Sequence, residues 1–156
     1  MESLPRTEIG PVPERDPATA QKIRVVHQAG DRFDVAIRGH HVTVDQPEEA
    51  GGADTAPTPT ELFVSSLASC VGFYARRFLA RHHLADHVEV GCRWWMDKSP
   101  ARVGAIEIEV SVPYLPPDKF DRFQKAVEHC TVHTTLGRPP LVVISTTTTG
   151  AGSEVA

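Results

Sequence analysis

The chain has 156 residues, of which 40% are hydrophobic and 23% are charged, and its formal net charge is −4 at pH 7. This length suits one well-buried domain, and the composition excludes a fibrous or wholly disordered chain. The negative charge, without a long basic run, argues against binding to nucleic acid. No apolar stretch is long enough for a membrane span or a signal peptide, so we expect a cytoplasmic protein.

Residues 1–20 contain four prolines and no apolar periodicity, which predicts a mobile or extended arm. The domain itself is expected to span residues 21–147 and to end in a loose tail, residues 148–156. Three short β-type runs open the domain, at residues 23–27, 32–37 and 41–44. Turn residues separate them, so they predict an antiparallel meander.

The segment from Thr58 to Glu61 predicts the start of a long helix. Thr58 is a suitable N-cap, Pro59 suits the first helical position, and Glu61 can close a capping box. The helix is expected to end near His82. Its apolar stripe comprises Phe63, Leu67, Cys70, Tyr74 and Phe78. These positions recur every three or four residues, so Cys70 is expected in mid-helix on the buried face.

Two alternating runs predict half-buried antiparallel strands after this helix. Their apolar positions are Val88, Val90, Cys92, Trp94 and Met96 in the first run and Ile106, Ile108, Val110 and Val112 in the second. A second helix is predicted after residues 113–118. Its core-facing stripe comprises Phe120, Phe123, Val127 and Cys130. Residues 141–146 predict a last strand, which gives an α+β fold of order β-β-β-α-β-β-α-β, with antiparallel sheets packed around two central helices.

Cys70 and Cys130 are the candidate reactive residues. A free cysteine usually behaves as a small buried hydrophobe, but these two lie on the inner faces of two helices that we expect to be neighbours. Small residues surround Cys70 in its helix, so its thiol can meet another thiol or a small substrate. Cys92 lies in a strand beside Trp94, and we interpret it as structural.

Two segments resemble the OsmC/Ohr family of organic hydroperoxide reductases. The first combines Asp45-Gln46-Pro47, Gly51-Gly52, residues 57–63 (PTPTELF) and residues 67–70 (LASC). The second is residues 129–136 (HCTVHTTL). The resemblance extends over residues 22–147 and includes the order of the elements. It implies an OsmC-like fold and an intertwined homodimer with the two cysteines at its interface.

The resemblance also implies roles for the two cysteines. Cys70 would be the peroxidatic cysteine, whose thiolate attacks the distal oxygen of an organic hydroperoxide, releases an alcohol and becomes a sulfenic acid. Cys130 would be the resolving cysteine, which condenses with that sulfenic acid to form a disulfide. An external dithiol, of the lipoyl type by resemblance, would then reduce the disulfide. This chemistry requires no metal or organic cofactor.

A thiolate at Cys70 needs a nearby cation, because burial in apolar surroundings raises the pKa of a thiol. Enzymes of the Ohr type use an Arg from the first hairpin, held by a Glu near the start of the cysteine helix. Arg32, beside the first turn, is the candidate for this role. Arg24 and Arg38 are the alternatives.

The position of the acid departs from the Ohr-type pattern. That pattern places it ten residues before the cysteine, where this chain has Thr60, whereas Glu61 lies nine residues before Cys70. At about 100° per residue, nine steps put Glu61 on the opposite side of the helix from Cys70. We therefore interpret Glu61 as the capping-box residue, and the departure favours the broader OsmC-like branch.

The leading interpretation is a homodimeric thiol peroxidase that reduces organic hydroperoxides through a Cys70–Cys130 disulfide. The first alternative is a non-enzymatic OsmC-like protein that binds a small apolar ligand at the dimer interface, near Phe63, Tyr74, Trp94 and Trp95. The second is a metal site formed by Cys70, Cys130 and His133. His129 and His133 could lower the pKa of the Cys130 thiol. Alternatively, they are found there only because the helix dipole favours a cationic side chain at the end of a helix.

Overall fold

The computed structural model describes residues 16–85 and 87–148. Most of the predicted N-terminal arm, residues 1–20, and of the predicted tail, residues 148–156, therefore lies outside the described residues. Residues 21–138 form one compact unit, and the described residues on either side of it, 16–20 and 139–148, belong to another. No described helix is long and apolar enough to cross a membrane.

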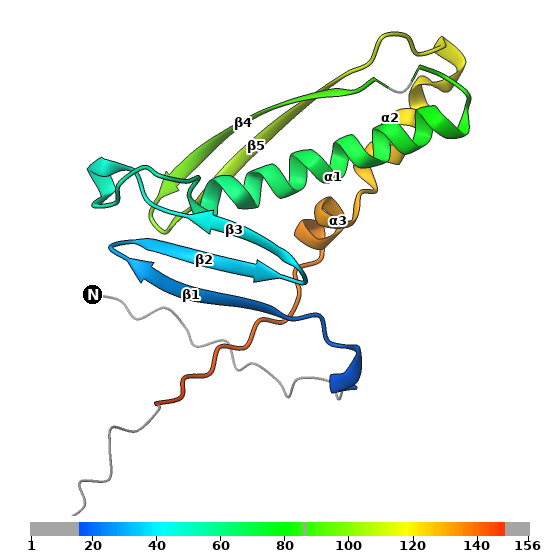
Figure 1. The fold of residues 1–156 in the computed structure, drawn as a ribbon. Coiled ribbons are helices and arrows are strands. Elements are labelled where there is room, and N and C mark those ends of the chain that lie inside the picture. The colour runs from blue at the N-terminus through cyan, green and yellow to red at the C-terminus, as the bar shows by residue number, and fades with distance from the viewer. Residues whose placement is uncertain (1–15, 86, 149–156) are drawn as a thin grey trace, which may run out of the picture. The chain divides into compact units, whose positions relative to one another are not determined.

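The first three strands form the predicted antiparallel meander (Figure 1). Strand β1 (Ile23–Ala29) pairs with β2 (Arg32–Ile37), and β2 pairs with β3 (His40–Val44). Gly30, in the first turn, has a φ of +57°, which glycine adopts without steric cost. Large apolar side chains of this sheet are exposed: Ile23, Val25, Val26, Phe33 and Ile37. The rest of the described chain therefore leaves much of the sheet uncovered.

The loop after β3 is organised by the carboxylate of Asp45, a side chain that is only 2% exposed. Its Oδ1 accepts a hydrogen bond from the N–H of Gln46 at 2.8 Å, and its Oδ2 accepts two from Thr55, from the N–H at 3.0 Å and the hydroxyl at 2.6 Å. The N–H of Asp45 donates to the carbonyl of Pro57 at 3.3 Å. Asp45 thus joins the end of the sheet to the residues that start the long helix.

The bonds to Asp45 lead to a prediction about pH and stability. The hydroxyl and N–H of Thr55 and the N–H of Gln46 lower the pKa of Asp45 from 3.8 to about 2. A lowered pKa in the folded state means that Asp45 contributes its stability fully above pH 3.8 and loses it as the pH falls toward 2. We expect Asp45→Asn to unfold at a lower temperature at pH 7 and to lose less further stability than the wild type at low pH.

Thermal denaturation at a series of pH values would measure this effect. Asp54→Asn is the matched control, because Asp54 lies exposed in the same loop with a φ of +49°, which asparagine tolerates well. The role of Asp45 would be disproved if the two variants had the same melting temperature at pH 7.

Helix α1 (Pro59–Arg81) begins with the predicted capping box. The hydroxyl of Thr58 accepts a hydrogen bond from the N–H of Glu61 at 3.1 Å, and the Glu61 carboxylate accepts one from the N–H of Thr58 at 2.7 Å. These two bonds satisfy N–H groups that have no partner within the helix. The prediction for Glu61 is therefore confirmed.

The buried face of α1 differs from the predicted stripe by about one position. Its buried residues are Val64, Leu67, Val71, Ala75 and Leu79. Phe63 is 40% exposed, whereas Cys70, Tyr74 and Phe78 pack against the core as partly buried residues. Neighbouring positions on a helix are about 100° apart, and the sequence offers apolar residues on both stripes. The packing partners of α1, not its own periodicity, decide which stripe is buried.

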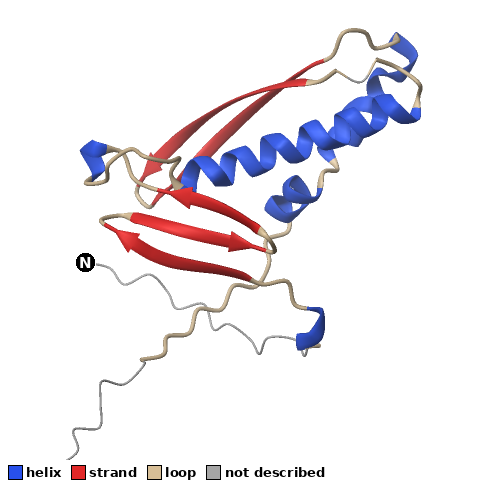
Figure 2. Ribbon diagram, viewed as in Figure 1, coloured by secondary structure: helices blue, strands red, loops and turns tan. Residues whose placement is uncertain are grey.

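Strands β4 (Glu89–Lys98) and β5 (Ala101–Ser111) form an antiparallel hairpin that lies along α1 (Figure 2). The predicted face of the second strand is confirmed, since Ile106, Ile108 and Val110 pack against the core. The predicted face of the first strand holds only near its start. A register shift follows Trp95, and Met96 beyond it is 51% exposed.

The predicted second helix is two helices, and the prediction that Cys130 lies on a helical stripe is wrong. Helix α2 (Phe120–Glu128) follows a 3-10 turn at Pro117–Lys119, and α3 (Thr131–Gly137) follows it after a break. Cys130 lies in the break, with an extended ψ of 148°, and acts as the N-cap of α3. The side chain of Cys130 is buried in the core and its sulfur accepts the N–H of His133, so packing and capping replace helical continuity at this position.

The core lies between α1, α2 and the β4–β5 hairpin. Its buried cluster comprises Leu67, Val71, Ala75, Leu79, Phe123, Val127 and Cys130. Phe78 of α1 packs edge to face on Phe123 of α2, with 5.4 Å between the ring centroids. Cys130 is therefore part of the core even though it lies outside both helices.

The predicted last strand is not formed. Residues 139–148 have no strand or helix assignment, and their apolar side chains are exposed: Leu141 by 46%, Val142 by 63%, Val143 by 56% and Ile144 by 87%. A strand requires a neighbour to pair its N–H and C=O groups. The composition of this segment favours a strand, but within the described chain it has no strand to pair with.

Candidate active site

The structure brings Cys70 and Cys130 together, although they are far apart in the sequence. Cys70 lies in the middle of α1 beside its buried face and is partly buried, whereas Cys130 is fully buried between α2 and α3. Both are free thiols; Cys70 packs against the core cluster that contains Cys130, and it is near enough to raise the pKa of the Cys130 thiol. The fold therefore brings the two thiols into one neighbourhood of the core.

The two thiols differ in their surroundings. Burial raises the pKa of the Cys130 thiol, the N–H of His133 opposes this effect, and the neighbouring Cys70 side chain raises the pKa further. That N–H donates to the Cys130 sulfur at 3.3 Å. With a raised pKa, Cys130 keeps its proton at neutral pH. Of the two thiols, the partly exposed Cys70 is the one that a small substrate can reach.

Two further contacts hold the turn that carries Cys130. The hydroxyls of Tyr74, one turn after Cys70 on α1, and of Thr131, next to Cys130, share a hydrogen bond of 3.1 Å. On the other side of the turn, Nδ1 of His133 donates to the carbonyl of Glu128 at 2.7 Å. The first contact ties the Cys130 turn to α1, and the second ties the start of α3 to the end of α2.

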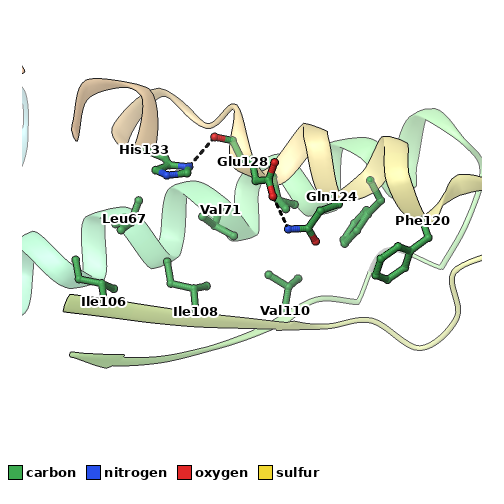
Figure 3. Close-up of a pocket in the computed structure, with 11 residues that line it drawn as sticks. Leu67, Val71, Ile106, Ile108, Val110, Phe120, Gln124, Glu128 and His133 are labelled. Carbon is green, nitrogen blue, oxygen red and sulfur yellow. Dashed lines mark hydrogen bonds between the residues drawn. The ribbon is translucent and has the colours of Figure 1, made fainter. Parts of the chain in front are cut away.

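A cavity of about 350 Å³ lies between α1, β5 and the α2–α3 segment (Figure 3). Its apolar floor comprises Leu67 and Val71 of α1 and Ile106, Ile108 and Val110 of β5. Phe120 and Phe123 of α2 add aromatic side chains to the lining, and Gln124, Glu128 and His133 provide the polar groups. Leu67, Val71 and Phe123 also belong to the core cluster that contains Cys130. The cavity therefore adjoins the core around the thiol pair.

Arg32 lies at the β1–β2 turn, where it lines a shallow hollow with Asp31, Asp45 and Gly51. The groups that shift the pKa of Cys130 do not include Arg32. Arg24 and Arg38 are exposed in the same sheet, Arg24 in β1 and Arg38 in the β2–β3 turn. The assignment of an activating arginine thus stays a prediction, and the described chain does not place Arg32 beside the cysteines.

The remaining predicted residues are dispersed. Cys92 lies in β4, where burial raises the pKa of its thiol, and it lines a hollow with Trp94 and Trp95. Phe63 lines a different hollow, beside Leu136. Within the single chain these residues line separate hollows, so the ligand cleft predicted at a dimer interface stays a prediction. The described residues also contain no group of three His, Cys, Asp or Glu side chains that could hold a metal ion.

Sequence reasoning missed the polar residues of the cavity. Gln124 and Glu128 lie four residues apart on α2 and are joined by a hydrogen bond of 2.7 Å between the Gln124 amide and the Glu128 carboxylate. Their helical spacing gave a signal, since such residues share a face, but an exposed polar face is the usual reading of such a pair. The structure shows that this face borders the cavity.

The fold and the site define an α+β protein with a two-cysteine site at the junction of its helices. The model of the family of OsmC-like proteins matches residues 51–145, more than half of the chain. The chain therefore belongs to the OsmC-like family. A comparison of the sequence with curated proteins gives no match.

Solved structures share the fold at low sequence identity. A putative osmotic stress induced and detoxification response protein from Psychrobacter arcticus has a TM-score of 0.67 at 20% identity, over 72% of this chain and 85% of its own. An OsmC-like protein from Mycoplasma pneumoniae has a TM-score of 0.63 at 15% identity, over 76% and 88%. An organic hydroperoxide resistance protein OsmC from Legionella pneumophila has a TM-score of 0.60 at 16% identity, over 78% and 91%.

Proposed function

We propose that this chain is a thiol peroxidase that reduces organic hydroperoxides to alcohols in the cytoplasm, through a disulfide between Cys70 and Cys130. The observation that carries the proposal is the pair of neighbouring free thiols, one partly exposed and one buried. The family assignment supports it, because a solved structure with this fold is described as an organic hydroperoxide resistance protein.

The reaction needs only the two thiols and an external dithiol. The Cys70 thiolate forms a bond to the distal oxygen of the hydroperoxide, the O–O bond breaks, and the leaving alkoxide takes up a proton to become the alcohol. The Cys130 thiol then attacks the Cys70 sulfenic acid, which forms the disulfide and releases water. A dithiol of the lipoyl type reduces this disulfide by thiol–disulfide exchange, which restores both thiols and leaves the reductant as a disulfide. Arg32 is proposed to support the Cys70 thiolate once the protein is assembled.

We also propose that the protein acts as a homodimer. The support for this assembly is the exposed apolar surface of the single chain, on the β1–β3 sheet and at residues 141–144. Contiguous exposed apolar residues on a soluble protein mark interaction surfaces. A second copy would cover this surface and would offer a strand partner to residues 141–144.

The rate of peroxide consumption by the purified protein tests the peroxidase proposal. With cumene hydroperoxide as substrate and dihydrolipoamide as reductant, we expect turnover by the wild type and by Cys92→Ser, which lacks the cysteine outside the pair. Cys70→Ser is expected to show only the uncatalysed rate, because serine is not ionised at neutral pH and cannot form a sulfenic acid. Equal rates for Cys70→Ser and the wild type would refute the proposal.

The cavity favours a second candidate function, a protein that binds a small apolar ligand without redox chemistry. A volume of about 350 Å³ falls within the range of small-molecule sites, roughly 300–1,000 Å³. Reaction of the thiols with an alkylating reagent across pH distinguishes the two functions. A Cys70 that reacts as a thiolate near neutral pH supports the peroxidase, and a thiol unreactive below pH of about 8.5 supports the binding protein.

A further inference from the structure

The polar end of the cavity carries an unbalanced negative charge. Its lining includes the carboxylate of Glu128 and no lysine or arginine, within the residues that the structure describes. One oxygen of this carboxylate accepts a hydrogen bond from the Gln124 amide at 2.7 Å, and the other remains available as an acceptor. A carboxylate in this position attracts hydrogen-bond donors and repels anions.

His133 adds a second acceptor to the same end of the cavity. Its Nδ1 lies 2.7 Å from the carbonyl oxygen of Glu128, and a carbonyl oxygen can only accept, so Nδ1 carries the proton. In the neutral ring, Nε2 is then an acceptor. Figure 3 shows the His133 ring and the Glu128 carboxylate on the same side of the cavity, facing the apolar floor of α1 and β5.

The two ends of the cavity thus have different chemistry. The floor and the end at Phe120 are apolar, whereas the end next to the Cys130 turn presents acceptors and a negative charge. A molecule that matches both ends has an apolar body and an uncharged head group that donates a hydrogen bond. A fatty-acid carboxylate of similar length matches the floor but brings a second negative charge next to Glu128.

We propose that Glu128 makes this cavity selective for uncharged amphipathic molecules with a hydroxyl-type head and excludes their carboxylate counterparts. If the chain is the proposed peroxidase, on which this consequence rests, its preferred substrates are neutral alkyl or aryl hydroperoxides. The hydroperoxides of free fatty acids would be poor substrates. The –OOH group of such a substrate can donate to Glu128 or His133, which flank the turn that carries Cys130.

Binding of unreactive ligands tests this selectivity without any redox step. We expect 1-octanol to bind the reduced protein and octanoate to bind at least about tenfold more weakly, the size expected for two like charges a few ångströms apart near a protein surface. Glu128→Gln keeps the shape of the side chain and one acceptor oxygen for Gln124, and it replaces the other oxygen by an NH2 group that can donate to the oxygen of a hydroxyl. It is expected to remove most of this difference by strengthening the binding of octanoate and leaving that of 1-octanol almost unchanged.

Asp121→Asn is the matched control, because Asp121 lies on the same helix, does not line the cavity, and its replacement changes the net charge equally. Titration calorimetry of both ligands against the wild type and the two variants gives all the required constants. The proposal would be overturned if the wild type bound the two ligands with equal affinity. It would also be overturned if Glu128→Gln and Asp121→Asn raised the affinity for octanoate by the same factor. Binding of neither ligand would also overturn it and would indicate that a second copy of the chain fills the cavity.

The test separates this inference from the proposed function. Selective binding of 1-octanol by a protein without peroxidase turnover would retain the cavity assignment and refute the peroxidase. Turnover with equal kcat/KM for cumene hydroperoxide and a fatty-acid hydroperoxide, unchanged in Glu128→Gln, would retain the peroxidase and refute the role of Glu128.

Discussion

Cys130→Ser is expected to react once with an organic hydroperoxide and then to stop at the sulfenic acid of Cys70. The serine hydroxyl cannot condense with a sulfenic acid to form a disulfide, whereas the wild type has the neighbouring Cys130 thiol. Turnover with a lipoyl-type dithiol should therefore fall close to the uncatalysed rate, because this reductant acts by exchange with a disulfide. Mass spectrometry of peptides after one equivalent of hydroperoxide measures both states.

The expected products are distinct. The wild type should yield a peptide pair joined through Cys70 and Cys130, and Cys130→Ser should yield a Cys70 peptide that is trapped by dimedone, a reagent specific for sulfenic acid. Cys92→Ser is the control and should give the wild-type pattern, since Cys92 lies in β4 outside the pair. A dimedone adduct on Cys130 in the Cys70→Ser protein would reverse the roles of the two cysteines.

The double substitution Val142→Asp and Ile144→Asp is expected to convert the proposed dimer into monomers. These side chains are 63% and 87% exposed in the single chain, and burial of each introduced carboxylate in an interface without a partner costs several kcal/mol. The dissociation constant of the dimer should rise at least about a thousandfold. Sedimentation velocity over a range of micromolar protein concentrations measures this change.

Thr146→Asp with Thr148→Asp is the matched control, because it adds the same charge to polar, exposed positions of the same segment. The control is expected to remain a dimer. If the wild type is a monomer, or if the dimer survives the first pair of substitutions, residues 141–144 are not part of the interface. In that case the exposed β1–β3 sheet would have to be tested in the same way.

Local signals in the sequence correctly predicted much of the fold. The start of α1 depends on groups within four residues of one another, from Thr58 to Glu61, so the sequence contains the whole capping box. The β1–β3 meander is similarly local, because its strands pair with their neighbours through short turns. The outcome is different for residues 141–146, where a strand requires a partner that the described chain does not supply.

The candidate site was predicted less completely, for a physical reason that Cys130 illustrates. Its spacing from Phe123 and Val127 fits a helical stripe, and it does join their buried cluster. However, the periodicity cannot reveal that the helix ends at Glu128 and restarts at Thr131. That break places Cys130 near Cys70 and Glu128 at the border of the cavity. Tertiary packing determines where the break falls.

The break has a consequence for the oxidised protein. The sulfur of Cys130 is the group that caps α3, through the N–H of His133. A sulfur in a disulfide is a poorer acceptor than a thiol with lone pairs directed at the helix, and it cannot take the negative charge that the N-terminus of a helix favours. Each catalytic cycle would therefore weaken and then restore the first turn of α3. The order of this helix would then depend on the oxidation state of the two cysteines.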